Sequence, residues 1–481
     1  MLEKHPIRVN HIGFYPNVPK RFILVENPEH NMTFTIDLIE DARFKEAFSG
    51  ELVECDDGFG NTMWTGDFSS LTDEGSYVIR AGGFKSRAFV IYSRAYEHTS
   101  RVLLSYFTYQ RCGSDLGYYG KCHLDDGYIK ETGEHVDLSG GYHQSCDLRK
   151  SPAGVSIGVY GMIEGALRDK SAWGKTLFKD EVAWACDYYV KTIQENGDMY
   201  NTLNAPFGWE GRVFYKSPAP SSAAWNVVSC LAMGSLYFKD SDKDRSEKYL
   251  ETSLRAYNRL ISDERSDEPY RHPDTLPLGM DPERFYYCNC QKNSVSDIAQ
   301  RGMASANLWR ATGEEHYRDE VKRCAEIVCD NMLKGNLATC IHVGNGHFLE
   351  TVASYYSCMP GGLMTLLEAD DIGVSDDYIK GKIIEAADSI CFISTKTIWR
   401  TPRKIYSDFD LDNSLQHVRQ GERAPTLREK LPSIEKVEDS ENDMKGYYSL
   451  KTIACSPCPL IYRGFILLKA YELTGDKKYL E

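Results

Sequence analysis

A short segment with two adjacent glycines carries the side chains best suited to chemistry in this chain. It spans residues 136–147 and ends on Asp147, with Tyr142 and His143 between the glycines and the carboxylate. Glycine has no Cβ, so the pair at 140–141 would let the backbone approach a ligand closely. A carboxylate beside an aromatic ring and an imidazole is a typical reactive arrangement. The segment therefore predicts an active-site loop.

The elements that must position this loop fall into two parts. Residues 7–93 contain short β-rich runs, including 21–25, 34–39 and the alternating run 73–80. Branched and aromatic residues at alternate positions favour half-buried strands, and several such strands at this spacing predict a small β-sandwich.

From about Arg94 onward the pattern changes to apolar residues spaced three and four apart. Clear examples are 155–167, 182–193 and 223–238, which predict amphipathic helices. In two segments, 308–317 and 471–480, a helical pattern ends at a glycine and is followed by charged residues that begin the next pattern. A glycine at this position is expected of a helix C-cap. The second part is thus expected to consist of repeated helical hairpins.

The glycine-pair loop resembles the signature of glycoside hydrolase family nine, whose usual form is Asp-Val-Ser-Gly-Gly-Trp-His-Asp-Ala-Gly-Asp. The segment at 9–16, followed by the segment at 19–25, is similar to the start of the immunoglobulin-like module that precedes many catalytic domains of this family. Further helical phrases at 105–113, 217–250 and 304–313 resemble the same family. The resemblance implies an immunoglobulin-like β-sandwich over 1–93 and an (α/α)6 helical barrel over 94–481, with the substrate groove at one end of the barrel.

The resemblance also implies catalytic roles. Inverting glycoside hydrolysis needs one carboxylate that activates water and one acid that protonates the leaving oxygen. Asp147 falls on the family's base, and Gln144 falls where a second aspartate normally helps to hold the water. A glutamine amide can orient water but adds no negative charge. Lys451 falls where the family's acid glutamate stands, and a lysine acts as a general acid only if burial lowers its pKa.

Other residues are candidates around this centre. Carboxylates just upstream of Lys451 could supply the proton instead, although charge runs are usually solvated loops: Glu435, Glu438, Glu441 and Asp443. Six residues are expected to line the sugar site: Tyr142, His143, Trp209, His417, Arg419 and Tyr448. Among them, His417 and Arg419 rest on a short His-x-Arg phrase, and Trp209 is either a stacking platform or a loop anchor.

Composition narrows the partners. The 481 residues carry a formal charge of −14, which disfavours nucleic acid and anionic membranes as partners. No stretch approaches the ~18 apolar residues of a membrane span, and the first residues show no export signal, although a removed signal would leave the same trace. Fifteen cysteines, an odd number, favour a reducing compartment over a disulfide framework. A soluble, cytoplasmic protein with a small carbohydrate substrate is expected.

No cofactor is expected, because no phosphate-binding glycine motif is present. No metal is expected either. The close pairs Cys288/Cys290 and Cys455/Cys458 could together supply four thiolates to zinc, but Cys-x-Cys is an unusual zinc spacing. The second pair also lies in a phrase that resembles the family without metal.

Three functions remain open on the sequence. The first is a glycosidase that acts on small β-linked oligosaccharides or glucosides, with Asp147 activating water and a nonstandard proton donor. The second is a carbohydrate-binding relative that has lost hydrolysis. The third is a different sugar reaction, an elimination or isomerisation, on the same fold, since a fold does not fix the chemistry.

Overall fold

The structure is a computed structural model of the 481-residue chain. It describes the following residues: 6–28, 31–56, 62–115, 120–143, 150–169, 176–204, 214–219, 221–262, 295–330, 340–343, 347–350, 353–354, 359–360, 362–395 and 458–479.

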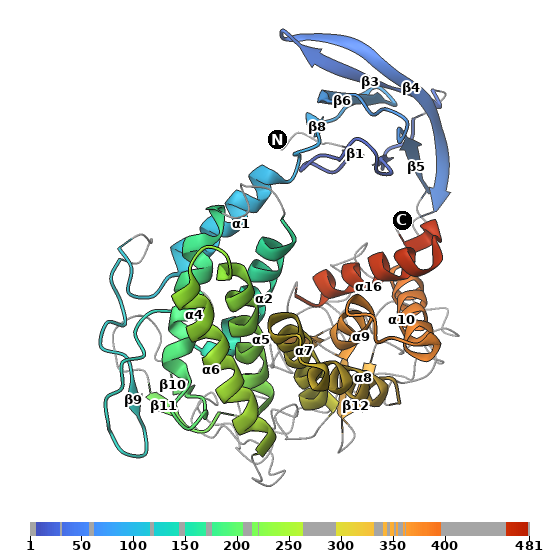
Figure 1. Cartoon of the computed structure of the whole chain (residues 1–481). Helices are drawn as coiled ribbons and strands as arrows, with labels where there is room; N and C mark the ends of the chain where they lie inside the picture. Colours follow the sequence, from blue (N-terminus) through green and yellow to red (C-terminus); the bar gives the residue numbers. More distant parts are fainter. Residues whose placement is uncertain are drawn as a thin grey trace, which may run out of the picture. The chain divides into compact units, whose positions relative to one another are not determined.

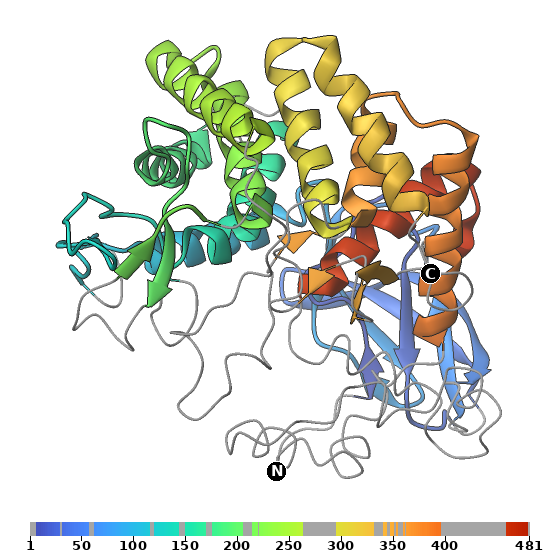
Figure 2. The same cartoon turned by 90° about the horizontal axis from the view of Figure 1, so that it is seen from below.

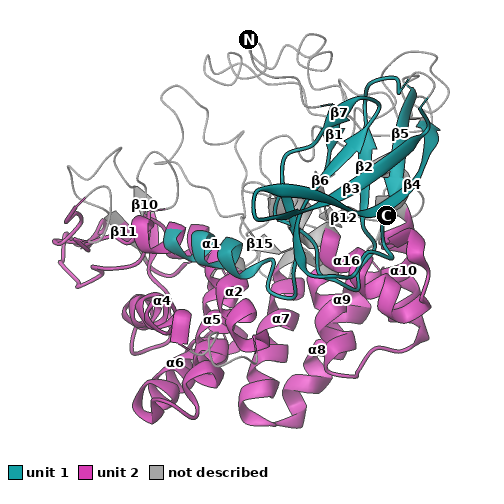
Figure 3. Cartoon of the chain, turned by 90° about the horizontal axis from the view of Figure 1, so that it is seen from above, with its two compact units in different colours: residues 1–105, 480 teal, residues 106–479, 481 magenta. Residues whose placement is uncertain are grey.

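The chain divides into two compact units, coloured separately in Figure 3. The first comprises essentially residues 1–105 and the second residues 106–479. The last strand of the first unit ends at Ile91, and the helix that follows begins at Glu97. The sequence-based boundary at residue 93 falls in this connection.

The first unit is built from antiparallel strands (Figure 1). Its strands are β1 Ile7–Arg8, β2 Arg21–Leu24, β3 Thr33–Glu40, β4 Arg43–Asp56, β5 Thr62–Asp67, β6 Gly75–Ala81, β7 Phe84–Lys85 and β8 Phe89–Ile91. They lie in the order β1-β2-β5-β4-β3-β6-β7, with β8 also paired to β6. The three runs predicted from alternation are strands β2, β3 and β6.

Strand β4 belongs to both halves of this β-structure. Residues 43–51 pair with β3, whereas residues 52–56 pair with β5. Alternate side chains on the strands point inward, and they form one core that includes Phe22, Phe34 and Ile36. Phe22 and Phe34 meet edge to face, with ring centroids 5.0 Å apart. The predicted alternation therefore produces the expected buried face.

The second unit is mainly helical. Its helices are α2 Pro152–Arg168, α4 Lys179–Thr192, α5 Ser221–Phe238, α6 Lys243–Ser262, α7 Val295–Thr312, α8 Glu315–Asp330, α9 Gly362–Asp371, α10 Asp377–Thr395 and α16 Cys458–Thr474. Helix α1, Glu97–Gln110, runs from the first unit into the second. A short 3-10 turn, η2, covers Lys477–Tyr479.

The helices of the second unit alternate between two layers (Figures 1 and 2). Helices α2, α5, α7, α9 and α16 contact one another in succession, and helices α4, α6, α8 and α10 pack beside them. Figure 2 shows α5 with α6 and α7 with α8 as neighbouring antiparallel hairpins. This alternation is the arrangement expected of an α/α barrel.

Local signals set the helix ends. Ser151 accepts a hydrogen bond from the Gly154 amide and so caps α2, whose first residue is a proline. Gly313 and Gly475 have positive φ angles of 74° and 70° just after α7 and α16, as the sequence predicted. The chain then continues as α8 in the first case and as η2 in the second. Within the described residues, no helix has the length and apolarity needed to cross a membrane.

The helical unit also contains short strands. Tyr128–Ile129 (β9), Asn201–Asn204 (β10) and Phe214–Lys216 (β11) form a three-stranded sheet. Two further pairs are β12 Cys340–Val343 with β13 His347–Glu350, and β14 Ala353–Ser354 with β15 Met359–Pro360. The three-stranded sheet matters for the site because the segment preceding the predicted loop hydrogen-bonds along β9.

Candidate functional site

The glycine-pair segment begins as a backbone partner of the end of α1. The Cys112 amide donates to the Gly141 carbonyl, and the His143 amide donates to the Gln110 carbonyl, each at 2.9 Å. Arg111 and Tyr142 form the bridge between these bonds. The entry to the predicted active-site loop is therefore fixed to a helix end by two backbone hydrogen bonds.

Both glycines adopt backbone angles that favour glycine, and Gly141 also packs closely against α4. Gly140 and Gly141 have φ angles of 96° and 73°, which side-chain-bearing residues rarely adopt. A Cβ atom on Gly141 would lie 2.6 Å from the ring of Tyr188, and Trp184 Nε1 donates to the Gly141 carbonyl at 2.9 Å. The sequence suggested a ligand as the close neighbour of this backbone. In the structure, the neighbour of Gly141 is the Tyr188 ring.

Tyr142 is anchored in the core, with only 2% of its surface exposed. Its hydroxyl donates to Glu181 Oε2 at 3.0 Å, and burial raises its pKa well above the ordinary value. Glu181 is itself held by Arg111 Nη2, at 2.9 Å from Oε1, and by the Thr108 hydroxyl. This network joins α1, α4 and the loop. The contacts give Tyr142 a positioning role, and its expected contact with a sugar stays a prediction.

A β-bridge closes the base of the predicted catalytic loop. His143 and Lys150 pair antiparallel, and the six residues between them in the sequence, 144–149, lie outside the described part of the chain. Gln144 and Asp147 belong to this loop. The other predicted site residues are likewise outside the described part of the chain: Trp209, His417, Arg419, Tyr448 and Lys451. The structure thus places the supports of the loop, and the roles of those seven residues stay predictions.

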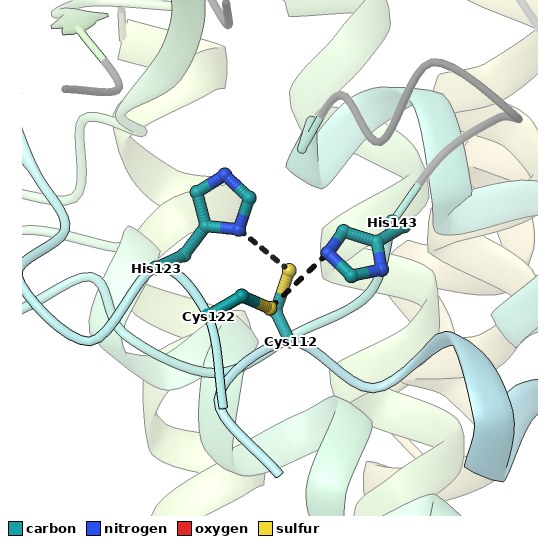
Figure 4. A group of neighbouring side chains, drawn as sticks. All are labelled: Cys112, Cys122, His123 and His143. Carbon is teal, nitrogen blue, oxygen red and sulfur yellow. Dashed lines mark hydrogen bonds between the residues drawn. The ribbon is translucent and has the colours of Figure 1, made fainter. Parts of the chain in front are cut away.

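Immediately before that loop, four side chains converge on one point (Figure 4). They are Cys112, Cys122, His123 and His143, each at most 6% exposed. Cys112 Sγ lies 3.5 Å from His123 Nδ1, and Cys122 Sγ lies 3.3 Å from His143 Nε2. All four candidate donor atoms lie within 4.8 Å of one another. We call this group the Cys2His2 cluster.

The cluster has the dimensions of a tetrahedral zinc site. Bond lengths of about 2.3 Å to sulfur and about 2.05 Å to nitrogen give a sulfur-to-nitrogen edge of about 3.6 Å in a tetrahedron. The two observed sulfur-to-nitrogen distances, 3.5 and 3.3 Å, are close to that value. Two thiolates and two imidazoles are a common donor set for structural zinc. The residues therefore fit this metal.

The electrostatics of the cluster favour one thiolate before any metal binds. A hydrogen bond from Cys112, together with contacts to His123 and His143, outweighs the effect of burial and lowers the pKa of Cys122 to about 2. Burial raises the pKa of Cys112 well above its usual value. The pair thus shares one proton, with Cys122 as the acceptor.

This cluster is not evident from cysteine spacing, because its two cysteines are not close together in the chain. The close pairs Cys288/Cys290 and Cys455/Cys458 have no described side chains. The cluster instead combines the adjacent Cys122 and His123 with a cysteine ten residues earlier and a histidine twenty residues later. The adjacent Cys-His pair near the signature loop is the one local signal that could have indicated it.

Comparison with known proteins identifies the family. Residues 96–418 match the sequence profile of glycosyl hydrolase family 9, and residues 3–86 match that of the cellulase N-terminal ig-like domain. The first match covers about two thirds of the chain. The observed β-sandwich and the paired helices that follow it coincide with these two matches. The chain belongs to glycosyl hydrolase family 9, as the resemblance implied.

Individual relatives agree with this assignment. A cellodextrinase from Butyrivibrio fibrisolvens is 28% identical over 375 residues, which cover 70% of this chain and 65% of the relative. The solved Bacteroides ovatus GH9 structure has a TM-score of 0.61 at 18% identity and covers 99% of this chain and 82% of that one. A zinc-binding triple mutant of a family 9 endoglucanase has a TM-score of 0.57 at 16% identity, covering 97% and 80%.

The comparisons confirm the predicted fold class, an (α/α)6 barrel preceded by an immunoglobulin-like β-sandwich. The solved structures support the fold alone, because their sequence identity to this chain is low. The chain spans less than two thirds of the length of the curated relatives that it matches, 65% of the cellodextrinase and 54% of an endoglucanase D from Acetivibrio thermocellus.

Proposed function

We propose that the chain is a glycoside hydrolase acting on small β-linked oligosaccharides or glucosides. The observation that carries the proposal is the match to the family, together with the anchoring of the signature segment: residues 141–143 are hydrogen-bonded to the end of α1, and His143 pairs with Lys150. Short substrates are supported by the similarity to a cellodextrinase.

In this proposal, Asp147 takes a proton from the attacking water, and Gln144 orients that water through its amide. A second group protonates the departing oxygen from the opposite side of the sugar, at roughly 6.5–9.5 Å from Asp147 in an inverting enzyme. Lys451 or one of the carboxylates between 435 and 443 supplies that proton. The anomeric configuration of the first product distinguishes an inverting from a retaining reaction.

The test is hydrolysis of cellooligosaccharides and aryl β-glucosides by the full chain, followed by proton NMR. Asp147→Asn is expected to reduce kcat by more than about a thousandfold, because the base is lost. Glu131→Gln removes an exposed carboxylate from the same region and serves as the matched control, with unchanged activity. Binding without turnover in the wild type would contradict the proposal and favour a carbohydrate-binding protein. A rearranged or unsaturated product would contradict it in favour of another sugar reaction.

Lys451→Met separates the two sources of the leaving-group proton. If Lys451 is the donor, aryl glucosides with good leaving groups keep most of their kcat while oligosaccharides lose theirs, because only the poor leaving group needs protonation. Equal rates in the variant and the wild type on both substrates would assign the donor to the upstream carboxylates. The predicted cytoplasmic location is a separate proposal, tested by cell fractionation.

We also propose that the Cys2His2 cluster holds a structural zinc ion. Support comes from its burial, its donor set and its tetrahedral spacing. A site with four protein ligands has no open position for substrate, so zinc would organise the loop entry rather than activate water. Asp147→Asn should leave the metal content of the purified protein unchanged.

A further inference from the structure

Lys150, the first described residue after the predicted catalytic loop, is fully buried. Lysine is almost never fully buried unless its ammonium group is paired. Here Lys150 Nζ donates to Asp126 Oδ2 at 2.9 Å and to the Leu138 carbonyl at 2.6 Å, and it lies 5.1 Å from the centroid of the Tyr188 ring. The charge is thus neutralised and hydrogen-bonded inside the protein.

Those partners come from segments that frame the loop. Leu138 belongs to the stretch that leads into the loop, and its amide donates to the Asp126 carbonyl at 2.8 Å. One ammonium group therefore joins the incoming segment, the Asp126 segment and the outgoing residue. The Lys150 carbonyl also accepts a hydrogen bond from the Thr202 hydroxyl of β10.

The geometry around Lys150 fixes the return of the loop through hydrogen bonds that the Cys2His2 cluster does not share. The cluster holds His143 on one side of the β-bridge, whereas the Asp126–Lys150 pair holds the other side. Asp147 stands three positions before Lys150. A shift of the Lys150 backbone would therefore move the proposed base relative to the substrate.

We propose that Lys150, held by Asp126 and Leu138, is a positioning residue that sets the exit of the Asp147 loop. The inference rests on the proposed hydrolase function for its effect on turnover. Its effect on the loop itself does not depend on that function.

The test uses the full chain and two variants. Lys150→Met leaves the Asp126 carboxyl buried without its partner, so this variant is expected to lose stability as well as activity. The double variant Asp126→Leu/Lys150→Met replaces the ion pair with apolar side chains, an exchange that often preserves the fold. If the pair were merely structural, activity would return together with the unfolding temperature in the double variant.

We expect the double variant to keep kcat at about one hundredth to one tenth of the wild-type value, with KM changed less than about threefold, because a misplacement of about 1 Å in a reacting group can cost about a hundredfold in rate. Lys20→Met is the matched control. Lys20 is also fully buried, and its Nζ bonds to the carbonyls of Pro16, Val18 and Ser69 in the first unit. Its loss should lower stability and leave kcat unchanged.

Hydrogen exchange provides the readout that does not need turnover. Amides in peptides covering 141–151 should exchange at least about tenfold faster in the double variant than in the wild type, with the peptides of α7 and α8, which are remote in sequence from Asp126, Leu138 and Lys150, unchanged. Unchanged exchange there, or a kcat that recovers fully in the double variant, would overturn the inference. A different outcome is that the wild type hydrolyses none of the substrates while the double variant still shows faster exchange. That combination would overturn the proposed function and leave the positioning role of Lys150 standing.

Discussion

Removal of metal from the Cys2His2 cluster offers a quantitative test of the site. The perturbation is dialysis of the full chain against a strong chelator in the presence of a reductant. A second perturbation, Cys122→Ser, removes the ligand that is already a thiolate in the absence of metal. Each perturbation should remove the part of the free energy of unfolding that depends on zinc and leave the remaining part.

The expected magnitude follows from the ligand set. Sites of this type bind zinc with about 10–16 kcal/mol, and a Kd of about 1 nM lies within that range. At about 1 µM free zinc, such a site adds about 4 kcal/mol to the free energy of unfolding. The second unit covers residues 106–479, for which an unfolding entropy of about 2 cal/mol/K per residue gives about 0.8 kcal/mol/K. The unfolding temperature should therefore fall by about 5 °C.

The assay combines elemental analysis with differential scanning calorimetry. The untreated protein should contain one zinc ion per chain, and the high-temperature transition of the helical unit should move on chelation and recover when zinc is added back. Cys230→Ser provides the control, because Cys230 is fully buried and lies outside the cluster. It should lose some stability, keep its zinc and retain the response to the chelator.

Two results would refute this reasoning. One is a wild-type protein, purified with zinc present, that contains no stoichiometric metal and unfolds at the same temperature with and without chelator. The other is a Cys122→Ser variant that holds as much zinc as the wild type, because the metal would then be bound elsewhere.

Three further outcomes are expected. Burial raises the pKa of the Cys112 thiol, so zinc binding should release about one proton from Cys112. The zinc affinity measured by calorimetry should therefore fall about tenfold for each pH unit below neutrality. An affinity that does not change with pH would contradict this. Arg310→Met should cost about 3 kcal/mol, because it leaves the buried Glu368 carboxylate unpaired, whereas adding Glu368→Leu should restore most of the loss in chemical denaturation. The pKa of Asp137 is lowered to about 2, because hydrogen bonds from Ser139 and the Lys191 ammonium outweigh the opposite effect of burial. The contribution of this carboxylate to the free energy of unfolding is therefore complete above about pH 4 and disappears as the pH falls toward 2. Since this carboxylate is mostly exposed, Asp137→Asn should cost under about 1 kcal/mol at pH 7, and an equal cost at pH 2 would be inconsistent with the pairing.

The sequence predicted the elements well where periodicity is strong. The helical patterns at 155–167 and 223–238 became α2 and α5, which extend those runs by only a few residues. The β-rich run 34–39 became β3 for a related reason, because Phe34 and Ile36 face one core. These patterns record burial on one face of an element, and burial is what local sequence reports most directly.

The site was less predictable, because it depends on which segments lie side by side. Tyr142 and His143 are adjacent in the sequence, and both were expected to face a sugar. In the structure, the pairing of this segment with the end of α1 directs Tyr142 to Glu181 and His143 to Cys122. No local sequence pattern predicts the β-bridge between Arg111 and Tyr142. The Cys2His2 cluster was therefore invisible to a search by spacing.

The shared strand β4 has a consequence for how the first unit comes apart. Because one continuous segment of 14 residues supplies a partner to β3 and then to β5, neither half of the β-structure can detach while the other stays intact. Loss of this segment would expose the aromatic interior on both sides at once. The domain should therefore open in a single step, and a protease that cuts within 43–56 should release no half-sized remnant.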